Sequence, residues 1–248
     1  MTPRFRMIAG PNGSGKTTLY RLLTGAYAVN FYTFLNADDM LAEARANGTL
    51  RVPLPLEETA LAEKLAVSTF PDSALCPFHD GRIVVKDGFI RFADPSAITS
   101  YTISFVTNLI RELMVEAGQS CSQETVFSHP GKIDALREAR ERGFRTYLYF
   151  VATDNPAINL FRVKAREANG GHGVPAAKVY SRYQRCLENL AAALPHLDRA
   201  YFFDDSELAM RYLAEFSATD GFSLKTANGT LPEWFLKHVP YKEGKVQG

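Results

Sequence analysis

The clearest chemical signature lies near the start of the chain, where Gly10-Pro-Asn-Gly-Ser-Gly-Lys-Thr17 matches the pattern G-x-x-x-x-G-K-[ST]. Glycines at this spacing allow successive backbone N–H groups to face one concavity, which suits the phosphates of a nucleoside triphosphate. Lys16 would reach the β- and γ-phosphates, and the Thr17 hydroxyl would bind the Mg²⁺ that bridges them. The nucleotide-binding residues expected on this basis are Gly10, Pro11, Asn12, Gly13, Ser14, Gly15, Lys16, Thr17 and Thr18.

A glycine-rich turn can also simply join a strand to a helix. Here the complete motif stands directly after an apolar segment and directly before a helical pattern, which is the context that a phosphate-binding loop requires. The context therefore favours nucleotide binding, although the motif does not say whether the γ-phosphate passes to water or to an acceptor.

Two carboxylates follow the second apolar segment, in Asn36-Ala-Asp38-Asp39. Ligands of an open parallel sheet bind at the carboxyl ends of its strands, so these side chains are candidates for the reaction site. Asp38 could take the proton from an acceptor hydroxyl. The alternative is that Asp38 or Asp39 caps the following helix, a common role of Asp at such a position, and the two carboxylates could also divide these roles.

A second acidic site, Glu124-Thr125, lies at the third apolar segment, and Ser128 follows it. A charged side chain at the edge of an apolar strand is costly unless it has a partner or a ligand. This cost favours a substrate-binding role for Glu124, with Thr125 and Ser128 as neighbouring polar contacts. The alternative is a surface carboxylate at the open end of the strand.

Three arginines form a further candidate group. Arg162 and Arg166 are four residues apart on a helical pattern and share a face, and the turn Gly170-Gly-His172 allows a second helix to bring Arg182 back towards them. Converging guanidinium groups suit the negative charge of a phosphoryl group in transfer. Any one of these arginines taken singly is more typical of a solvated helix face, and the glycine turn between them favours the functional reading.

Alternating apolar runs and helical patterns indicate an α/β fold in which helices cover a parallel five-stranded sheet of the P-loop NTPase type. The expected strands are 5–9, 31–35, 125–128, 145–152 and 199–203, and the expected helices are 16–26, 38–47, 56–69, 98–117, 131–142, 156–168, 175–194 and 206–216.

We expect one domain over residues 1–248, with an insert at about 71–96 and an extension at about 217–248. The insert carries Asp87-Gly88 between two apolar runs, which predicts a β-hairpin near residues 82–92. In the extension, Trp234 is expected to pack in the core, and the polar tail 242–248 is expected to fray.

Composition excludes several classes of function. Lys and Arg number 28 against 27 Asp and Glu, so the net charge of +1 gives no surplus for binding nucleic acid. The three cysteines form no CxxC pair, which argues against a disulfide framework or a thiolate zinc site. No segment has the length and apolarity of a membrane span or a secretory leader, so we expect a cytoplasmic protein that does not bind membranes.

Taken in order, Ile8-Ala-Gly-Pro-Asn-Gly-Ser-Gly-Lys-Thr-Thr18, Asn36-Ala-Asp38, Glu124-Thr125 and the arginine segment from Arg162 to Tyr183 resemble the zeta-toxin family of P-loop kinases. The resemblance covers about residues 5–206 apart from the insert, and the Gly-Gly-His-x-Val-Pro variant is similar to the chromosomal branch often described as predicted ATPases.

This resemblance implies a kinase that uses ATP and Mg²⁺ and phosphorylates a sugar hydroxyl of a nucleotide sugar, which is UDP-N-acetylglucosamine for toxin members. It also implies an antitoxin as a protein partner. Lys16 and Thr17 match the ligands of phosphate and magnesium, Asp38 the general base, and Glu124 the acidic substrate-binding residue. Arg166 and Arg182 are the best matches to the arginines that contact phosphate, with Arg162 as the rival of Arg166.

Two alternatives to this function stay open. One is a P-loop kinase of another nucleoside or of a dinucleotide. The other is an ATP-hydrolysing switch, because Tyr201-Phe-Phe-Asp204-Asp205 is an apolar strand that ends in an acidic pair, as in a Walker B site. The strand comes last in the chain, and we expect Asp205-Ser206 to cap the next helix instead.

Overall fold

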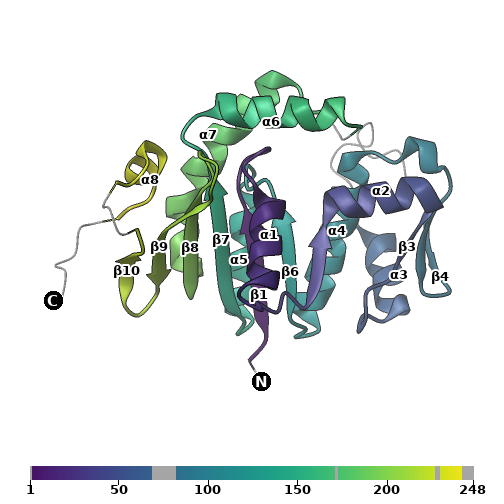
Figure 1. The fold of residues 1–248 in the computed structure, drawn as a ribbon. Helices are drawn as coiled ribbons and strands as arrows, with labels where there is room; N and C mark the ends of the chain where they lie inside the picture. The colour runs from purple at the N-terminus through teal and green to yellow at the C-terminus, as the bar shows by residue number, and fades with distance from the viewer. Residues whose placement is uncertain (1, 69–81, 171–172, 227–229, 242–248) are drawn as a thin grey trace. The chain divides into compact units, whose positions relative to one another are not determined.

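A computed structural model describes residues 2–68, 82–170, 173–226 and 230–241 (Figure 1). The chain divides into two compact units. The first unit contains Met1–Asn30 and Thr125–Gly248, and the second contains Phe31–Glu124.

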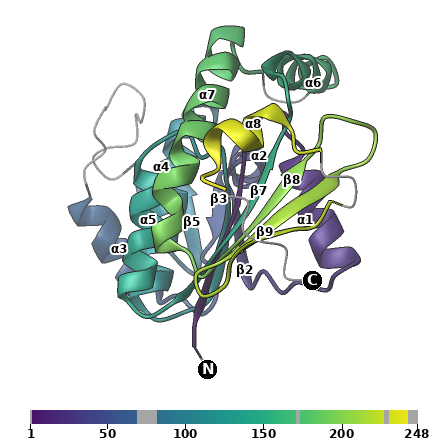
Figure 2. The same ribbon diagram turned by 90° about the vertical axis from the view of Figure 1, so that its left-hand side faces the viewer.

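The first unit contributes five neighbouring strands of a sheet, in the order β10-β9-β8-β7-β1. Strands β1, β7 and β8 are parallel, whereas β9 and β10 continue the sheet in antiparallel pairs. Figures 1 and 2 show helix α1 on one face of this sheet and helices α5 and α7 on the other. The elements are β1 (Arg4–Ala9), α1 (Lys16–Gly25), α5 (Gly131–Glu141), β7 (Arg145–Ala152), α6 (Pro156–Ala168), α7 (Ala176–Ala193), η2 (Leu194–His196), β8 (Arg199–Asp204), β9 (Arg211–Ser217), β10 (Gly221–Leu224) and α8 (Glu233–His238).

The central strands of this sheet are apolar along almost their whole length. In β7 only Arg145 is exposed, and the seven residues from Thr146 to Ala152 are buried. Such continuous burial is typical of a parallel strand covered on both faces, and it explains why the sequence runs apolar instead of alternating. The covered strands hold the loops at their carboxyl ends, which carry the candidate site residues, on a rigid base.

The segment 206–216, which we predicted as a helix, is instead a short irregular stretch followed by strand β9. β9 pairs antiparallel with β8, and a register shift lies between Phe202 and Phe203 of β8. Its Tyr212 stacks on Phe203 with ring centroids 5.0 Å apart. Aromatic cross-strand packing of this kind favours a strand over the helix that the apolar spacing suggested.

The second unit contains the parallel strands β2 and β6 and a separate three-stranded antiparallel sheet of order β3-β5-β4. Helix α4 packs against β2, α2 and α3. The elements are β2 (Thr33–Asn36), α2 (Ala37–Asn47), β3 (Thr49–Arg51), α3 (Glu58–Val67), β4 (Ile83–Lys86), β5 (Phe89–Phe92), η1 (Pro95–Ala97), α4 (Ser100–Glu116) and β6 (Cys121–Thr125).

The third predicted strand, 125–128, was placed too late in the chain, because β6 ends at Thr125. The apolar pattern of the sequence did not reveal the start of β6, because two of its buried residues are polar. Ser122 donates a hydrogen bond to the carbonyl of Phe31 (2.5 Å), and Gln123 donates to the side chain of Asn108 (3.4 Å). Both side chains thus donate a hydrogen bond inside the unit, which lowers the cost of their burial, whereas Gln123 Oε1 is buried without a hydrogen-bond partner among the described residues.

The five parallel strands that we predicted are present as β1, β2, β6, β7 and β8, but the count was wrong because β9 and β10 were missed. In the insert, β4 and β5 pair antiparallel around Asp87-Gly88, whose φ angles of 56° and 75° fit a tight hairpin turn. The insert residues 71–81, the tail 242–248 and the Gly171-His172 part of the glycine turn lie outside the described residues. No helix among the described residues is long and apolar enough to span a membrane.

Candidate functional site

The phosphate-binding motif forms the loop between β1 and α1 in the first unit. Its first two motif glycines stand where the loop touches backbone of other elements. A Cβ atom at Gly10 would lie 2.1 Å from the carbonyl oxygen of Val151, and one at Gly13 would lie 2.5 Å from the carbonyl oxygen of Asn159. The loop therefore packs directly against β7 and α6, which only glycine allows at these two positions.

The residues of this loop fit the phosphates of a nucleotide. Helix α1 begins after Gly15, and its first turn has neither a side-chain cap nor an acidic residue. No capping side chain therefore accepts hydrogen bonds from the first N–H groups of α1, and a phosphate can accept them. Lys16 donates to the carbonyl of Pro11 (2.9 Å) and so lies back over the loop, while Thr17 is exposed on the first turn. A Mg²⁺ ion would be held by the Thr17 hydroxyl together with the phosphates.

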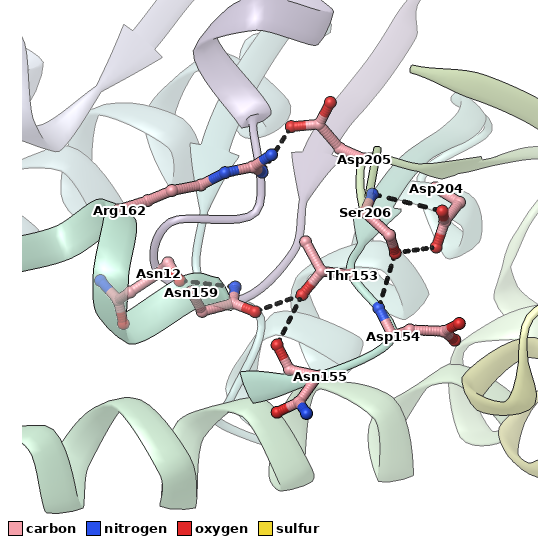
Figure 3. A network of polar contacts seen from close by, with 9 residues as sticks. All are labelled: Asn12, Thr153, Asp154, Asn155, Asn159, Arg162, Asp204, Asp205 and Ser206. Carbon is pink, nitrogen blue, oxygen red and sulfur yellow. Dashed lines mark hydrogen bonds and ion pairs between the residues drawn. The ribbon is translucent and has the colours of Figure 1, made fainter. Parts of the chain in front are cut away.

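Helix α6 is fixed to this loop by a buried asparagine. The Asn159 side chain is fully buried, and its Nδ2 donates to the carbonyl of Asn12 (2.7 Å). The Asn159 Oδ1 atom accepts a hydrogen bond from the Thr153 hydroxyl, and the Tyr183 hydroxyl of α7 donates to the Thr153 carbonyl (2.6 Å). Figure 3 shows the chain of contacts from Thr153 through Asn159 to Asn12. The P-loop, α6 and α7 are thereby joined in one hydrogen-bonded set.

The arginines differ in their relation to the loop. Arg162 Nη1 lies 2.7 Å from Asp205 Oδ2, and a Cβ at Gly15 would lie 2.3 Å from the same oxygen. Arg182 Nη1 donates to Asn12 Oδ1 at 3.4 Å. Arg166 lies one turn beyond Arg162 and is exposed. The structure thus brings Arg162 and Arg182 to the P-loop.

The acidic pair at the end of β8 does not cap a helix, contrary to our expectation. Asp204 is fully buried and accepts hydrogen bonds from the Ser206 hydroxyl (2.9 Å) and from Trp234 Nε1 (2.9 Å). Arg211 of β9 pairs with its other oxygen at 3.2 Å. The Ser206 hydroxyl also accepts from the backbone N–H of Asp154 (2.8 Å). Asp204 therefore ties β9 and α8 to the loop between β7 and α6, as Figure 3 shows in part.

Thr125 ends β6 and Ser128 lies in the loop after it, and both residues are partly exposed. Helix α7 holds this loop in place, because the Cys186 thiol donates to the carbonyl of Val126 and Asn189 Nδ2 donates to the carbonyl of Phe127 (2.9 Å). Burial raises the pKa of the Cys186 thiol to about 12, against the opposing charges of Lys16, Arg182 and Arg185, so this cysteine is a structural donor and not a nucleophile.

In the second unit, Asn36 organises the predicted acidic residues. Its Oδ1 accepts from the N–H groups of Asp38 (2.9 Å) and Asp39 (3.4 Å), and its Nδ2 donates to Glu124 Oε2 (3.3 Å). Asn36 is therefore the cap of α2, so the alternative in which Asp38 or Asp39 caps the helix is wrong. Both aspartates occupy the first turn with exposed side chains. Capping by Asn36 leaves their carboxylates to other roles.

Three residues that organise the site were missed from the sequence: Asn36 as a cap, Asn159 as the anchor of α6, and Asp205 as the partner of Arg162. The dipeptide Asn155-Pro156, which starts α6, marked where the helix begins. Asn159 one turn later could have been noted as a polar residue on the buried face. No comparable signal pairs Asp205 with Arg162, because the two are 43 residues apart and meet only in the folded chain.

No family model matches the chain. An uncharacterized protein of Haemophilus influenzae is 35% identical over 60 residues, which is 24% of this chain and 43% of that protein. The match thus covers less than half of that relative.

Among solved structures, a chain of the AvrRxo1-ORF1:AvrRxo1-ORF2 complex is 17% identical with a TM-score of 0.53, covering 91% of this chain and 62% of that chain. The same complex with ATP gives 18% identity and a TM-score of 0.50, covering 90% and 61%. A chain of the PezAT chromosomal toxin–antitoxin system of Streptococcus pneumoniae is 13% identical with a TM-score of 0.47, covering 85% and 70%. The present chain spans about three fifths of the AvrRxo1 chain, and it shares the fold of that chain.

Proposed function

We propose that this protein is an ATP-dependent kinase that transfers the γ-phosphate of ATP to a hydroxyl group of a small molecule. The observation that carries the proposal is the P-loop with an uncapped helix N-terminus behind it and two arginines, Arg162 and Arg182, beside it. Phosphoryl transfer needs positioning and neutralisation of negative charge more than covalent chemistry, and these residues supply both. The AvrRxo1 complex has been solved with ATP, which supports ATP as the nucleotide.

In this proposal each residue of the first unit has one task. The backbone N–H groups of the loop and Lys16 hold the phosphates, and Thr17 binds Mg²⁺, which when bound neutralises phosphate charge. Arg162 and Arg182 stabilise the charge that builds up on the transferred group. Arg166, one turn further along α6, is proposed to contact phosphate more weakly.

Asp38 is proposed as the general base that takes the proton from the acceptor hydroxyl. It lies in the first turn of α2, and the Asn36 cap frees it from a capping role. Glu124, held by the same Asn36, is proposed to bind the acceptor, together with Thr125 and Ser128. Asp39 is the matched control for Asp38, since it stands beside it in the same turn with the same charge.

The acceptor that the motif resemblance favours is a nucleotide sugar such as UDP-N-acetylglucosamine. To test this, the protein is incubated with ATP, Mg²⁺ and UDP-N-acetylglucosamine, and products are separated by mass. We expect a sugar nucleotide heavier by one phosphate, and Asp38→Asn should slow its formation by roughly 100-fold or more while Asp39→Asn has little effect. Loss of activity in Asp39→Asn alone would exchange the two roles. Phosphorylation of a nucleoside or dinucleotide in place of the sugar would support the proposed kinase activity with a different acceptor.

An antitoxin-like protein is the proposed macromolecular partner. The AvrRxo1 structures are complexes of two proteins, ORF1 and ORF2, which supports a protein partner for a chain of this fold. The partner can be sought by co-expressing this protein with the gene that adjoins its own and testing whether the two co-purify. Co-purification together with inhibition of ATP consumption would support the proposal.

A further inference from the structure

The Arg162–Asp205 pair lies directly on the P-loop, at the glycine that precedes the catalytic lysine. Asp205 Oδ2 accepts from Arg162 Nη1 at 2.7 Å, and a Cβ on Gly15 would meet the same oxygen at 2.3 Å. The Asp205 side chain is 13% exposed and that of Arg162 is 32% exposed. Figure 3 shows the guanidinium of Arg162 extended from α6 towards this carboxylate.

Both ends of the pair are attached to rigid structure. On one side, Asn159 fixes the first turn of α6 to the P-loop, so the backbone that carries Arg162 is fixed one turn away. On the other side, the Asp205 N–H donates to the carbonyl of Ala152 (2.9 Å), which places Asp205 at the carboxyl ends of β7 and β8. The long Arg162 side chain connects these two anchors.

A free arginine side chain samples many rotamers, and ordering it costs up to about 2 kcal/mol. The Asp205 carboxylate, which lies beside the P-loop at Gly15, removes much of that freedom before any nucleotide binds. The bond to Asp205 uses one of the five N–H donors of the guanidinium, so the remaining donors can face a phosphoryl oxygen. A group ordered in advance stabilises a transition state without reorganisation at the moment of reaction.

We propose that Asp205 is a positioning residue, which holds the Arg162 guanidinium against the P-loop so that Arg162, and not Arg166, meets the phosphoryl group in transfer. This proposal rests on the proposed function. It differs from a purely structural ion pair, which would stabilise the fold and leave the recognition of the transferred group to other residues.

The test is a double-mutant cycle with a readout that needs no acceptor. Binding of a fluorescent ADP analogue with Mg²⁺ is measured with and without fluoroaluminate, which imitates the phosphoryl group in transfer. The ratio of the two affinities measures how well the site recognises that group. The variants are Arg162→Ala, Asp205→Asn and the double variant, and the thermal unfolding of each is measured in parallel.

We expect Arg162→Ala to reduce the fluoroaluminate ratio at least about 10-fold, and Asp205→Asn to reduce it by a similar factor, with little change in the affinity for the ADP analogue alone. The double variant should be no worse than Arg162→Ala, because Asp205 acts through Arg162. Arg162→Ala should also melt lower than the double variant, since it leaves a mostly buried carboxylate unpaired.

Two controls keep the outcomes apart. Glu215→Gln breaks an ion pair with Arg199 between β8 and β9 and should leave the ratio unchanged. If the wild type fails to bind the ADP analogue, or Lys16→Ala binds it as well as the wild type, the proposed function fails. Two results would overturn the positioning role and leave the kinase proposal standing, provided that the wild type binds the analogue and shows the fluoroaluminate effect. The first is an unchanged affinity ratio in Asp205→Asn. The second is a ratio in the double variant that is lower than in Arg162→Ala. A large loss in Arg166→Ala with none in Arg162→Ala would return the role to Arg166.

Discussion

At the scale of single residues, Lys16 is the side chain on which nucleotide use most directly depends. It lies over the P-loop with its ammonium group on the Pro11 carbonyl, a contact that a phosphate can replace. We expect Lys16→Ala to unfold at nearly the wild-type temperature and to lose ATP-dependent turnover, because its charge acts on phosphates and not on the core. Thermal unfolding followed by an ADP-release assay checks both parts. Near-normal turnover in a folded variant would contradict the catalytic role of the P-loop.

The Asp205 carboxyl also leads to a prediction about how the stability of the protein depends on pH. Burial raises the pKa of its carboxyl above the ordinary 3.8, the charge and hydrogen bond of Arg162 oppose this, and Asp204 adds to it. The folded state therefore binds this proton more tightly than the unfolded state, so the stabilising contribution is present at low pH and is lost as the pH rises through the raised pKa.

Asp205→Asn removes this titration. We expect the stability of this variant relative to the wild type, measured as the difference between their free energies of unfolding in urea, to be higher at pH 7 than at pH 4. A variant that is more stable at neutral pH but binds the fluoroaluminate complex more weakly would have the signature of a residue retained for function. An equal difference at the two pH values would show that Asp205 does not titrate in this way.

How far single residues could be predicted depended on whether their partners were local. The P-loop was predicted residue by residue because its geometry is encoded in consecutive positions. Arg162 and Arg166 share a helix face, so their spacing could not rank them; the ranking came from Asp205, which lies 43 positions away. The assignment of catalytic roles to Asp38, Glu124 and the arginines remains a prediction.

At the scale of elements, Asn36 joins two functions at the start of α2. Asn36→Ala removes both the cap of the helix and the donor to Glu124, and we expect a loss of about 1 kcal/mol in stability. Asn36→Ser introduces a hydroxyl that can cap the helix, but it removes the amide group that donates a hydrogen bond to Glu124. We therefore expect Asn36→Ser to recover most of the stability and still to raise the KM of the acceptor. If the two variants show equal KM values close to the wild type, Asn36 is a cap and nothing more.

Elements with a strong helical period were predicted well, and α6 has the bounds that the pattern indicated. The strand β10 was missed together with β9, and β6 and β9 show why the predictions failed. β6 contains buried polar residues, Ser122 and Gln123, whose partners come from other parts of the second unit. β9 contains apolar residues whose spacing also fits a helix, and only pairing with β8 and the stack of Tyr212 on Phe203 decide for the strand. Tertiary partners thus overrode the local pattern in both cases.

At the scale of the whole molecule, the chain divides into two compact units, with the nucleotide-binding motif in the first and Asp38 and Glu124 in the second. The segment after β8 belongs to the first unit. The burial of Trp234 and Phe235 confirms the prediction that this extension packs on the body of the protein. Trp234 is 3% exposed and donates to the buried Asp204. Sequence alone could not indicate Asp204 as the attachment point, because the two residues are 30 positions apart.

This attachment predicts graded losses of stability. Trp234→Phe retains most of the buried area and removes one donor to Asp204, and we expect a cost of about 1–3 kcal/mol. Trp234→Ala also leaves a cavity beside Phe150 and Phe235, and we expect a cost of about 3–5 kcal/mol. Urea denaturation measures both. Equal costs for the two variants would mean that the hydrogen bond, and not packing, holds α8.

The most direct test of the proposed kinase activity uses no assumption about the acceptor. A metabolite extract is incubated with ATP, Mg²⁺ and either the wild-type protein or Lys16→Ala, and mass spectrometry compares the two mixtures. We expect the wild type to convert at least one hydroxyl-bearing metabolite into a product heavier by one phosphate, and Lys16→Ala to form none of it. Release of ADP and inorganic phosphate by the wild type, with no phosphorylated product in the extract, would contradict a kinase and indicate an ATP-hydrolysing switch.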